Sequence, residues 1–415
     1  MMATLEELAE MQSDDPELVP EIVPADARLS LKGPVSLFIH LLERVVTIPP
    51  LKETIRGTAY TMVEAFDSDE GVASYSQATA MDGIQTLSVK TTGLKVLRSG
   101  SALFPGKKLL EILKNAPSPI AKIEVKADTA TVTAGQAVWT LSVPREDSLP
   151  PMPDVSSLSL RTYSVASFLE ALTIARVSVS ESRARPAFMQ ANISHGSMTS
   201  CDGSRISRKV LPEFPDDVDF SIPIASMDEL IKALKASSSE TFEYGYSGLY
   251  LVFHIDHDVL TVQRLLVSFP DVENLLLAPA ISNHFGLRVD REELLEVIKR
   301  VRINADPDFY GIFLNIVPDK KYADGEYSWL VVVQAKDRNG NAAQETISGA
   351  WYGSTKSMDL CFNHKFLTDM LQSFPEDEVL LKVGESTKTQ KFPILIEQPE
   401  LGFTSVLQQI SIRLA

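Results

Sequence analysis

Six short amphipathic segments recur along the chain, and they constrain its fold more than any other feature. Each segment places apolar residues at helical spacing, as Met227, Leu230 and Leu234 do in MDELIKALK. The segments start roughly 60 to 70 residues apart, a spacing typical of a repeated structural unit. They are GPVSLFIHLLERV from Gly33, FPGKKLLEILKNA from Phe104, VASFLEALTIARV from Val165, ASMDELIKALKAS from Ala225, DREELLEVIKRVR from Asp290 and NHKFLTDMLQSF from Asn363.

Two of these segments carry a residue type that typically caps the N-terminus of a helix. Asp290 precedes an acidic first turn, and Ser226 precedes Met227. A side-chain oxygen at this position accepts a hydrogen bond from a backbone N–H that has no partner within the helix. We therefore expect helices to begin close to both residues.

The stretches between the helical segments read as β-strands. AKIEVKADTATVTAGQAVWTLSV alternates apolar and polar residues, and YSWLVVVQAKDRNGNAAQETISGAWYG does so around a turn at Asn339-Gly340. The pattern predicts an α+β fold in which one helix and several antiparallel strands occur six times. Two such units per domain give three domains of about 125 residues, a usual domain size.

Two stretches without periodic patterning predict the domain borders. DSLPPMPDVSS, residues 147–157, is rich in proline, and LLLAPAISNHFG is the second candidate linker, residues 275–286. The acidic start of the chain lacks a hydrophobic core pattern, and we expect it to be partly disordered. The predicted division is an extension over 1–27 and domains over 28–153, 154–282 and 283–415.

Composition narrows the function classes. The chain has 415 residues, 44% of them hydrophobic, and its apolar runs are shorter than the roughly 20 residues that span a bilayer. It has two cysteines, Cys201 and Cys361, and neither a secretory signal pattern nor a cysteine-rich zinc motif. The net charge of −16 argues against coating nucleic acid by bulk attraction but permits a positive inner surface. We expect a cytoplasmic protein without a membrane partner.

Motifs of catalysis are absent from the sequence. It contains no GxxxxGK[ST], GxSxG or HExxH pattern. The segment FHIDHD holds His254, Asp256, His257 and Asp258, which are potential metal ligands. Alternate residues of a strand face opposite ways, so a polar hairpin tip is the favoured interpretation. A metal-dependent hydrolase that uses this segment stays the enzymatic alternative.

Basic residues occur on or just after several of the helical segments. A single helix with a charged face indicates only solvent exposure, but several such helices in one repeat series favour a shared basic surface. The residues are Lys107, Lys108, Lys114, Arg176, Arg183, Arg185, Lys232, Lys235, Lys299 and Arg302.

A second local feature is the Asp202-Gly203 pair in SMTSCDGSRISRKVLP, which predicts a tight turn between two strands. Arg205, Arg208 and Lys209 follow it at once, although the chain as a whole is acidic. The turn is either a simple connection or the floor of a binding site.

Five stretches together resemble the bacterial sliding clamp, the beta subunit of DNA polymerase III. They are QTLSVKTTGLKV, SVSESRARPAFMQANI, MTSCDGSRISRKVLP, SFPDVENLLLAP and the terminal ISIRLA. Their order and spacing make the resemblance specific, and it extends over about residues 28 to 415. The chain is identified as a divergent or second-copy member of that family.

The resemblance implies a fold of three similar domains, each with two helices inside and sheets outside. Two chains would close head to tail as a homodimer ring around double-stranded DNA, touching mainly phosphates, so the ten basic residues above would face the DNA. Implied partners are the clamp loader, the replicative polymerase and other proteins that carry a clamp-binding motif, in the cytoplasm at the nucleoid. The implied role is non-catalytic and needs no cofactor or metal. A clamp-like scaffold or decoy that does not load on DNA is the alternative.

The resemblance also implies a hydrophobic pocket for partner peptides at the border of the second and third domains. Its residues here are Phe188, Cys201, Gly203, Ser204, Ile206, Pro270, Asn274, Leu275, Pro393, Ile410, Ser411, Ile412 and Arg413. Some positions depart from the family pattern. Ser204 replaces a histidine, Ile206 a leucine, Asn274 a basic residue, and Ser411-Ile412 a Pro-Met pair. Peptide preference is therefore expected to differ from that of a standard clamp.

Overall fold

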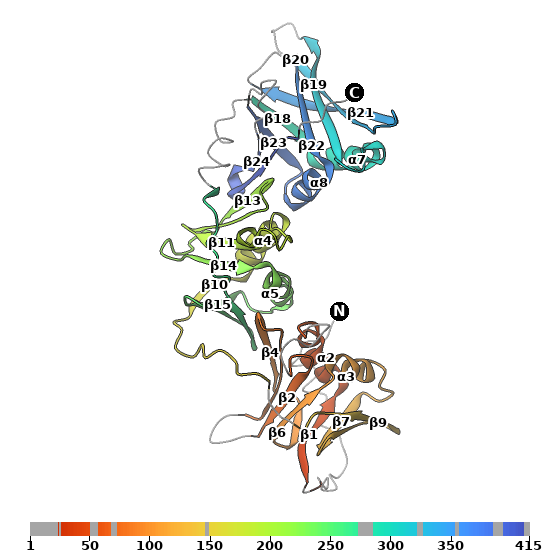
Figure 1. Ribbon diagram of the computed structural model, residues 1–415, viewed down its shortest axis with the longest axis vertical. Coiled ribbons are helices and arrows are strands. Elements are labelled where there is room, and N and C mark those ends of the chain that lie inside the picture. The colour runs from red at the N-terminus through yellow and green to blue at the C-terminus, as the bar shows by residue number, and fades with distance from the viewer. Residues whose placement is uncertain are drawn as a thin grey trace. The chain divides into compact units, whose positions relative to one another are not determined.

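The structure is a computed structural model, and it describes most of the chain (Figure 1). The described residues are 24, 26–49, 57–67, 73–145, 149–272, 285–321, 327–352, 357–384 and 393–410. The acidic extension over 1–27 therefore lies almost wholly outside the described residues, and so do residues 275–284 of the second predicted linker.

All six amphipathic segments are helices, which confirms the prediction. They are α2 (Val35–Glu43), α3 (Gly106–Lys114), α4 (Val165–Val177), α5 (Ile224–Ala236), α7 (Arg291–Val301) and α8 (His364–Ser373). Short 3-10 turns are η1 (Val45–Thr47), η2 (Pro186–Phe188), η4 (Arg302–Asn304) and η5 (Pro399–Leu401). Five of the six helices follow directly on a strand and α3 follows after the single residue Pro105, so a strand–helix junction marks every repeat.

The two predicted caps have different outcomes. Asp290 caps α7, and its Oδ1 accepts a hydrogen bond of 2.7 Å from the backbone N of Glu293. Ser226 is not a cap, because α5 begins two residues earlier, at Ile224. The N–H of Ile224 is bonded instead to the carbonyl of Met189 at 2.9 Å. A tertiary hydrogen bond thus takes over the role that the sequence pattern gave to a side chain.

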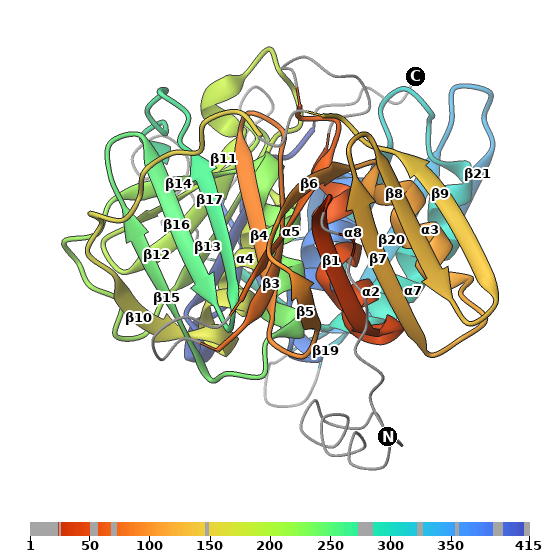
Figure 2. The same ribbon diagram turned by 90° about the horizontal axis from the view of Figure 1, so that it is seen from below.

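The strands form three antiparallel sheets, of five, eight and twelve strands. The first has the order β5 (Lys95–Arg98), β1 (Ala27–Pro34), β7 (Ile120–Lys126), β8 (Thr129–Ala134) and β9 (Ala137–Ser142). The second has the order β10 (Arg161–Ser164), β15 (Thr241–Tyr246), β16 (Tyr250–Ile255), β17 (Asp258–Gln263), β4 (Gln85–Thr91), β3 (Tyr75–Met81), β2 (Thr61–Phe66) and β6 (Gly100–Phe104). Figure 2 shows β15, β16, β17 and β4 side by side.

The third sheet contains the remaining strands. Its order is β14 (Phe220–Pro223), β11 (Gln190–Ser194), β12 (Ser197–Cys201), β13 (Arg205–Val210), β25 (Phe403–Leu407), β24 (Ile394–Gln398), β23 (Glu378–Val383), β18 (Phe285–Asp290), β21 (Ala342–Tyr352), β20 (Tyr327–Lys336), β19 (Gly311–Lys321) and β22 (Met358–Asn363). The predicted turn at Asn339-Gly340 joins β20 to β21, and Gly340 has the positive φ of 88° that such a turn needs.

Strand pairing shows that the repeats are joined in pairs. The strand before the first helix of a pair bonds to the first strand after the second helix. The strand before the second helix bonds in turn to the first strand after the first helix. This exchange occurs as β1–β7 with β6–β2, as β10–β15 with β14–β11, and as β18–β23 with β22–β19. Three copies of one exchange confirm the fold class of three similar domains, each built from two helix-plus-sheet repeats.

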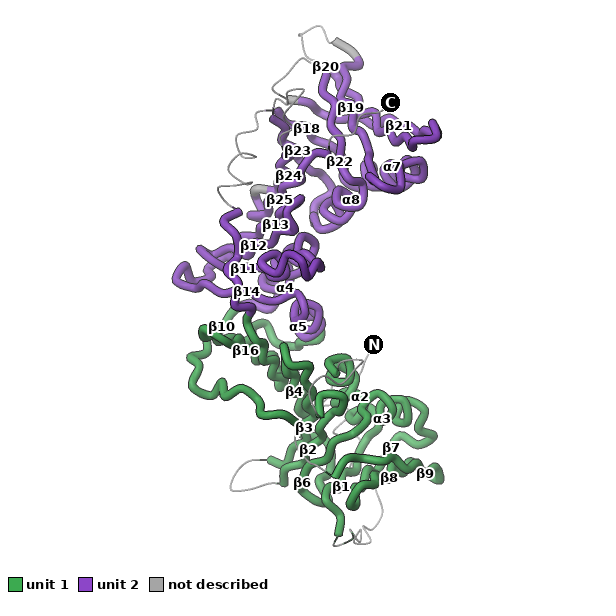
Figure 3. The backbone as a smooth tube through the Cα atoms, viewed as in Figure 1, with its two compact units in different colours: residues 1–163, 236–264 green, residues 164–235, 265–415 purple. Residues whose placement is uncertain are grey.

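The chain clusters into two compact units, which Figure 3 colours separately. The first comprises residues 1–163 and 236–264, and the second residues 164–235 and 265–415. Inside the first unit β17 pairs with β4, and inside the second β13 pairs with β25. These two pairings join neighbouring domains strand to strand. The residue borders of the three domains stay a prediction, because the compact units divide the chain elsewhere.

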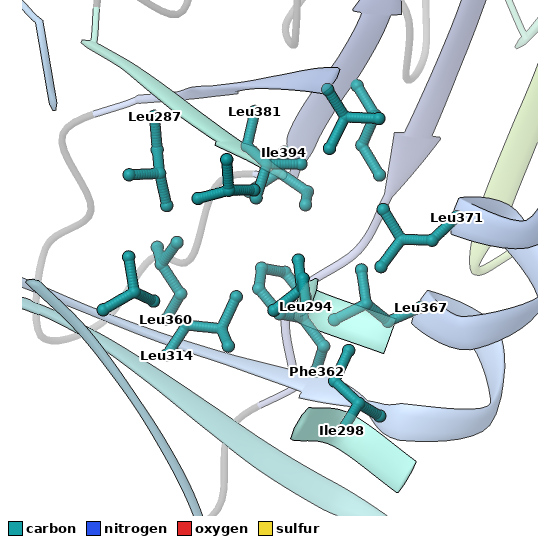
Figure 4. Packing of buried hydrophobic residues seen from close by; sticks show 14 of the residues in the cluster. Leu287, Leu294, Ile298, Leu314, Leu360, Phe362, Leu367, Leu371, Leu381 and Ile394 are labelled. Carbon is teal, nitrogen blue, oxygen red and sulfur yellow. The ribbon is translucent and has the colours of Figure 1, made fainter. Parts of the chain in front are cut away.

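A large apolar core fills the last third of the chain. Leu294 and Ile298 of α7 and Leu367 of α8 lie against the sheet residues Leu314 and Phe362 (Figure 4), and none is more than 1% exposed. Burial of each such side chain contributes about 2 kcal/mol. This core holds α7 and α8 on one face of β19 to β22 and thereby fixes the helix surface of the unit.

Candidate functional site

The Asp202-Gly203 turn joins β12 to β13, as predicted, and it is held by its own side chain. Oδ1 of Asp202 accepts hydrogen bonds from the backbone N of Ser204 at 2.8 Å and of Arg205 at 3.0 Å. Gly203 has a φ of 92°, and a Cβ there would lie 2.7 Å from Nη1 of Arg185. The positive φ therefore favours glycine at this position, and a Cβ there would displace the guanidinium of Arg185.

A cluster of apolar residues packs next to this turn, and we name it the apolar pocket because the resemblance implies a peptide pocket here. Its buried residues are Cys201, Ile206, Val272, Leu395 and Val406, and the half-buried rings of Phe188 and Phe269 pack against them. The residues come from β12, β13, β24 and β25 and from two loops. Two aromatic rings that stay partly exposed over a buried aliphatic floor are suited to receive apolar side chains of a ligand.

A groove of about 750 Å³ borders the same turn. One wall is the end of α4 with Arg176 and the loop after it with Glu181. The opposite wall is α8 with Phe366 and Asp369, and the turn itself forms a border of the groove. The groove therefore combines ring, carboxylate and guanidinium groups next to the apolar pocket, so it has the chemistry to bind the polar residues that flank an apolar anchor.

The structure brings several of the predicted pocket residues together. Phe188, Cys201 and Ile206 lie in the apolar pocket, and Gly203 and Ser204 form the turn. Three further predicted residues belong to the described part of the chain. Pro270 accepts a hydrogen bond of 2.8 Å from the N of Val272, Pro393 is buried just before β24, and Ile410 donates its N–H to the carbonyl of Cys361 at 2.9 Å. Asn274, Leu275, Ser411, Ile412 and Arg413 lie outside the described residues.

Sequence reasoning missed four members of the apolar pocket. They are Phe269, Val272, Leu395 and Val406. Phe269 and Val272 flank Pro270 in the SFPDV stretch, and Leu395 lies two residues after Pro393. The missing information was the pairing of β13 with β25, which brings Ile206 opposite Val406. No local pattern specifies which distant strand will be the neighbour.

Burial controls the chemistry of the cysteine in the pocket. Cys201 is fully buried, and this burial raises the pKa of its thiol from 9.0 to about 11. The thiol therefore stays protonated at neutral pH and is a packing group with low nucleophilicity.

This pKa shift predicts a pH dependence of stability. Because the folded state resists ionisation of Cys201, the stabilisation is complete below about pH 9 and is lost as the pH rises towards about 11. We expect this to lower the free energy of unfolding by up to about 2 kcal/mol. Urea unfolding at increasing pH measures it, with Cys201→Ala as the control that lacks the contribution of this thiol to the slope. Equal slopes for both proteins would contradict the prediction.

The ten predicted basic residues differ in how far their charge is already neutralised. Arg176 contacts Asp228 and Glu181, Lys232 contacts Glu229, and Lys299 contacts Glu296, all within 3.2 Å. In the part of the chain that the structure describes, the other basic residues form no ion pair within 4.0 Å; they are Lys107, Lys108, Lys114, Arg183, Arg185, Lys235 and Arg302. Arg185 lies beside the turn and donates to the carbonyl of Asp202 at 3.1 Å.

The FHIDHD segment is a hairpin tip between β16 and β17 whose acidic groups have structural partners. Asp256 accepts hydrogen bonds from the hydroxyls of Ser237 and Ser239 at 3.0 and 2.6 Å, and Asp258 forms an ion pair with Arg44. Among the described residues, no three metal-ligating side chains lie close enough to hold an ion. No observation therefore favours the hydrolase alternative. No helix in the described ranges is long and apolar enough to cross a membrane.

Comparison with solved structures identifies the fold. The DNA polymerase III beta subunit of Pseudomonas aeruginosa matches 92% of this chain and 100% of its own, with a TM-score of 0.78 and 17% identity. The sliding clamp of Bacillus subtilis matches 93% of this chain and 100% of its own, with a TM-score of 0.80 and 16% identity. The fold is that of the bacterial sliding clamps.

Comparison with curated proteins leads to the same class. The beta sliding clamp of Rickettsia bellii is 23% identical over 322 residues, which cover 74% of this chain and 81% of the relative. That of Staphylococcus aureus is 23% identical over 294 residues, which cover 69% and 74%. No family model matches the chain. The chain thus resembles the beta sliding clamps and is divergent from them.

Proposed function

We propose that the chain is a DNA sliding clamp, a non-catalytic ring that encircles duplex DNA and tethers replication proteins. The observation that carries the proposal is the threefold strand exchange together with its domain joints. Two joints, β17–β4 and β13–β25, are made within the chain. A third joint of the same kind would close a ring from two copies of the chain.

Free strand edges for that third joint are present in the described part of each unit. The last strand of the five-stranded sheet is β9, and Val138 on it is 62% exposed. Residues 342–349 of β21 pair with β20 alone, since β18 reaches only residues 350–352. Ile303 and Phe309 follow shortly after α7 in the sequence, and they are 81% and 57% exposed. Unpaired edges with exposed apolar residues favour strand addition between copies.

The apolar pocket is the proposed site at which the clamp binds its partner proteins. A short partner segment would place apolar anchors over Phe188 and Phe269 and its flanking polar residues in the groove beside α8. Sliding clamp structures from Pseudomonas aeruginosa and Bartonella birtlesii are described as bound to griselimycin. Griselimycin is therefore a practical probe, together with an anchor peptide: a short fluorescein-labelled peptide with two adjacent large apolar residues between polar ones. The clamp loader and the replicative polymerase are the partners proposed for this site.

Whether the chain encircles DNA is tested by comparing its retention on circular and on linear DNA. The purified chain should have twice its monomer mass, should stay on nicked circular DNA after loading by a clamp loader, and should leave when that DNA is linearised. Binding that survives linearisation contradicts a ring. A dimer that binds the anchor peptide but is never retained on circular DNA would favour the decoy alternative.

The ring edge gives a separate prediction. Replacing Ile303 with aspartate is expected to weaken the dimer about 30-fold or more, because a central apolar contact contributes about 2 kcal/mol. The side chain is 81% exposed, so the monomer fold should be unaffected. Sedimentation over a concentration series measures the dimer dissociation constant. Leu249→Asp, at a residue 51% exposed on a different turn, is the matched control. An unchanged dimer dissociation constant for Ile303→Asp would show that η4 is not part of the dimer interface.

A further inference from the structure

Strand β13 has two chemically different faces. Ile206 points into the apolar pocket, whereas Arg205, Ser207 and Lys209 alternate with it and contact the helices. Oγ of Ser207 lies 2.7 Å from Oγ of Ser178, just after α4. Arg205 and Lys209 therefore lie on the face of β13 that meets the helices, whereas Arg208 shares the face of Ile206.

Arg205 makes the strongest of these contacts, and its side chain is only 11% exposed. Its Nε donates to Oδ2 of Asp202 at 2.9 Å, and its Nη1 donates to Oδ2 of Asp369 at 3.0 Å. The guanidinium carbon lies 4.3 Å from the ring centroid of Phe366. A planar, largely desolvated guanidinium between two carboxylates and an aromatic face is held in one orientation.

The contacts of Arg205 link two elements that are distant in sequence. Asp202 shapes the turn through the N–H groups of Ser204 and Arg205, while Asp369 and Phe366 belong to α8. Arg205 thus links the turn directly to α8. Without it, the carboxylate of Asp202 loses its buried counter-charge, and the turn loses its contact with α8.

We propose that Arg205 is a positioning residue, which holds the turn against α8 so that the pocket and the groove are formed before the partner segment arrives. The proposal rests on the proposed function, because the partner segment belongs to it. Pre-formed sites bind more tightly, since the ordering of the loop has been completed before association. Arg205 acts through Asp369, and its nearly buried guanidinium is already committed to these partners.

A double-mutant cycle tests the pairing. We expect Arg205→Met to weaken binding of the anchor peptide about tenfold and Asp369→Asn about threefold, with the double variant no worse than Arg205→Met. Arg205→Lys should recover little, because an ammonium cannot contact both carboxylates in the fixed fork geometry. Additive losses in the double variant would mean that each residue contacts the peptide independently, which would overturn the proposal.

The far end of the same strand face supplies the control. Lys209 is 5% exposed and lies 3.0 Å from Glu170 of α4, so Lys209→Met also removes a buried cation from β13. It should lower the unfolding temperature but leave anchor-peptide affinity within about twofold of the wild type. Equal losses of affinity for Lys209→Met and Arg205→Met would show a general structural effect and contradict a positioning role.

Amide hydrogen exchange separates this inference from the proposed function. The N–H groups of Ser204 and Arg205 bond to Asp202, so Arg205→Met should speed their exchange about tenfold, and Lys209→Met should not. If the wild type bound neither the anchor peptide nor griselimycin while this difference persisted, the pocket function would fail and the turn-holding role would stand. Unchanged exchange and unchanged affinity in Arg205→Met would overturn the inference alone.

Discussion

Replacing Phe188 with aspartate is expected to weaken binding of the anchor peptide at least about 100-fold. The half-buried ring packs over Cys201, Ile206 and the other residues of the apolar pocket, and aromatic residues in such positions dominate binding energy at about 2 to 4 kcal/mol each. Aspartate removes that contact and adds a charge that a peptide anchor would have to desolvate. Fluorescence polarisation measures the affinity.

The controls for this experiment distinguish a loss of peptide binding from a loss of folding. Phe66→Asp changes another partly exposed aromatic residue, 39% exposed and on strand β2, and should leave peptide affinity unchanged. The dimer mass of Phe188→Asp should also equal that of the wild type, since the proposed ring edges lie on β9 and β21. Ile206→Asp is the second variant, because it puts the charge on the pocket floor itself. Wild-type affinity in both variants would show that the peptide binds elsewhere.

Replacing Lys107, Lys108 and Lys114 of α3 with alanine is expected to give the largest loss of DNA affinity among the helix variants. These lysines are exposed, and within the described ranges they have no acidic partner in ion-pair distance. Three lost phosphate contacts lower the magnitude of the slope of log affinity against log salt by about 3 and weaken binding by about two orders of magnitude near 0.1 M salt. A salt series of duplex binding measures both quantities.

A matched triple variant on other helices tests whether the lack of an acidic partner explains the larger loss of DNA affinity. Arg176, Lys232 and Lys299 are each already paired with a carboxylate, so their replacement by alanine should change the slope by about 1 or less. A phosphate must displace those carboxylates before it gains from the charge. Equal slopes for the two triple variants would mean that ion pairing within the protein does not decide which helix contacts DNA.

Local patterns along the chain were sufficient to predict the repeating architecture. The helical spacing of apolar residues predicted all six helices, and alternation predicted the strands between them, because each element must bury one face of known period. The turn at Asp202-Gly203 was equally predictable, since an aspartate that bonds its following N–H groups and a glycine with positive φ define it locally. Departures occurred where a tertiary contact replaced a local one, as at Ile224.

The sequence by itself thus determined the repeat, its helices and the apolar and polar faces of its strands, since these follow from neighbours within a few residues. Only the tertiary structure decided which strands meet, and with them the pocket. Ile206 lies opposite Val406, and Arg205 contacts Asp369, across 200 and 164 positions of the chain. Such pairs are selected by the packing of whole sheets and by the burial of charge next to its partner, and neither leaves a periodic signal in the sequence.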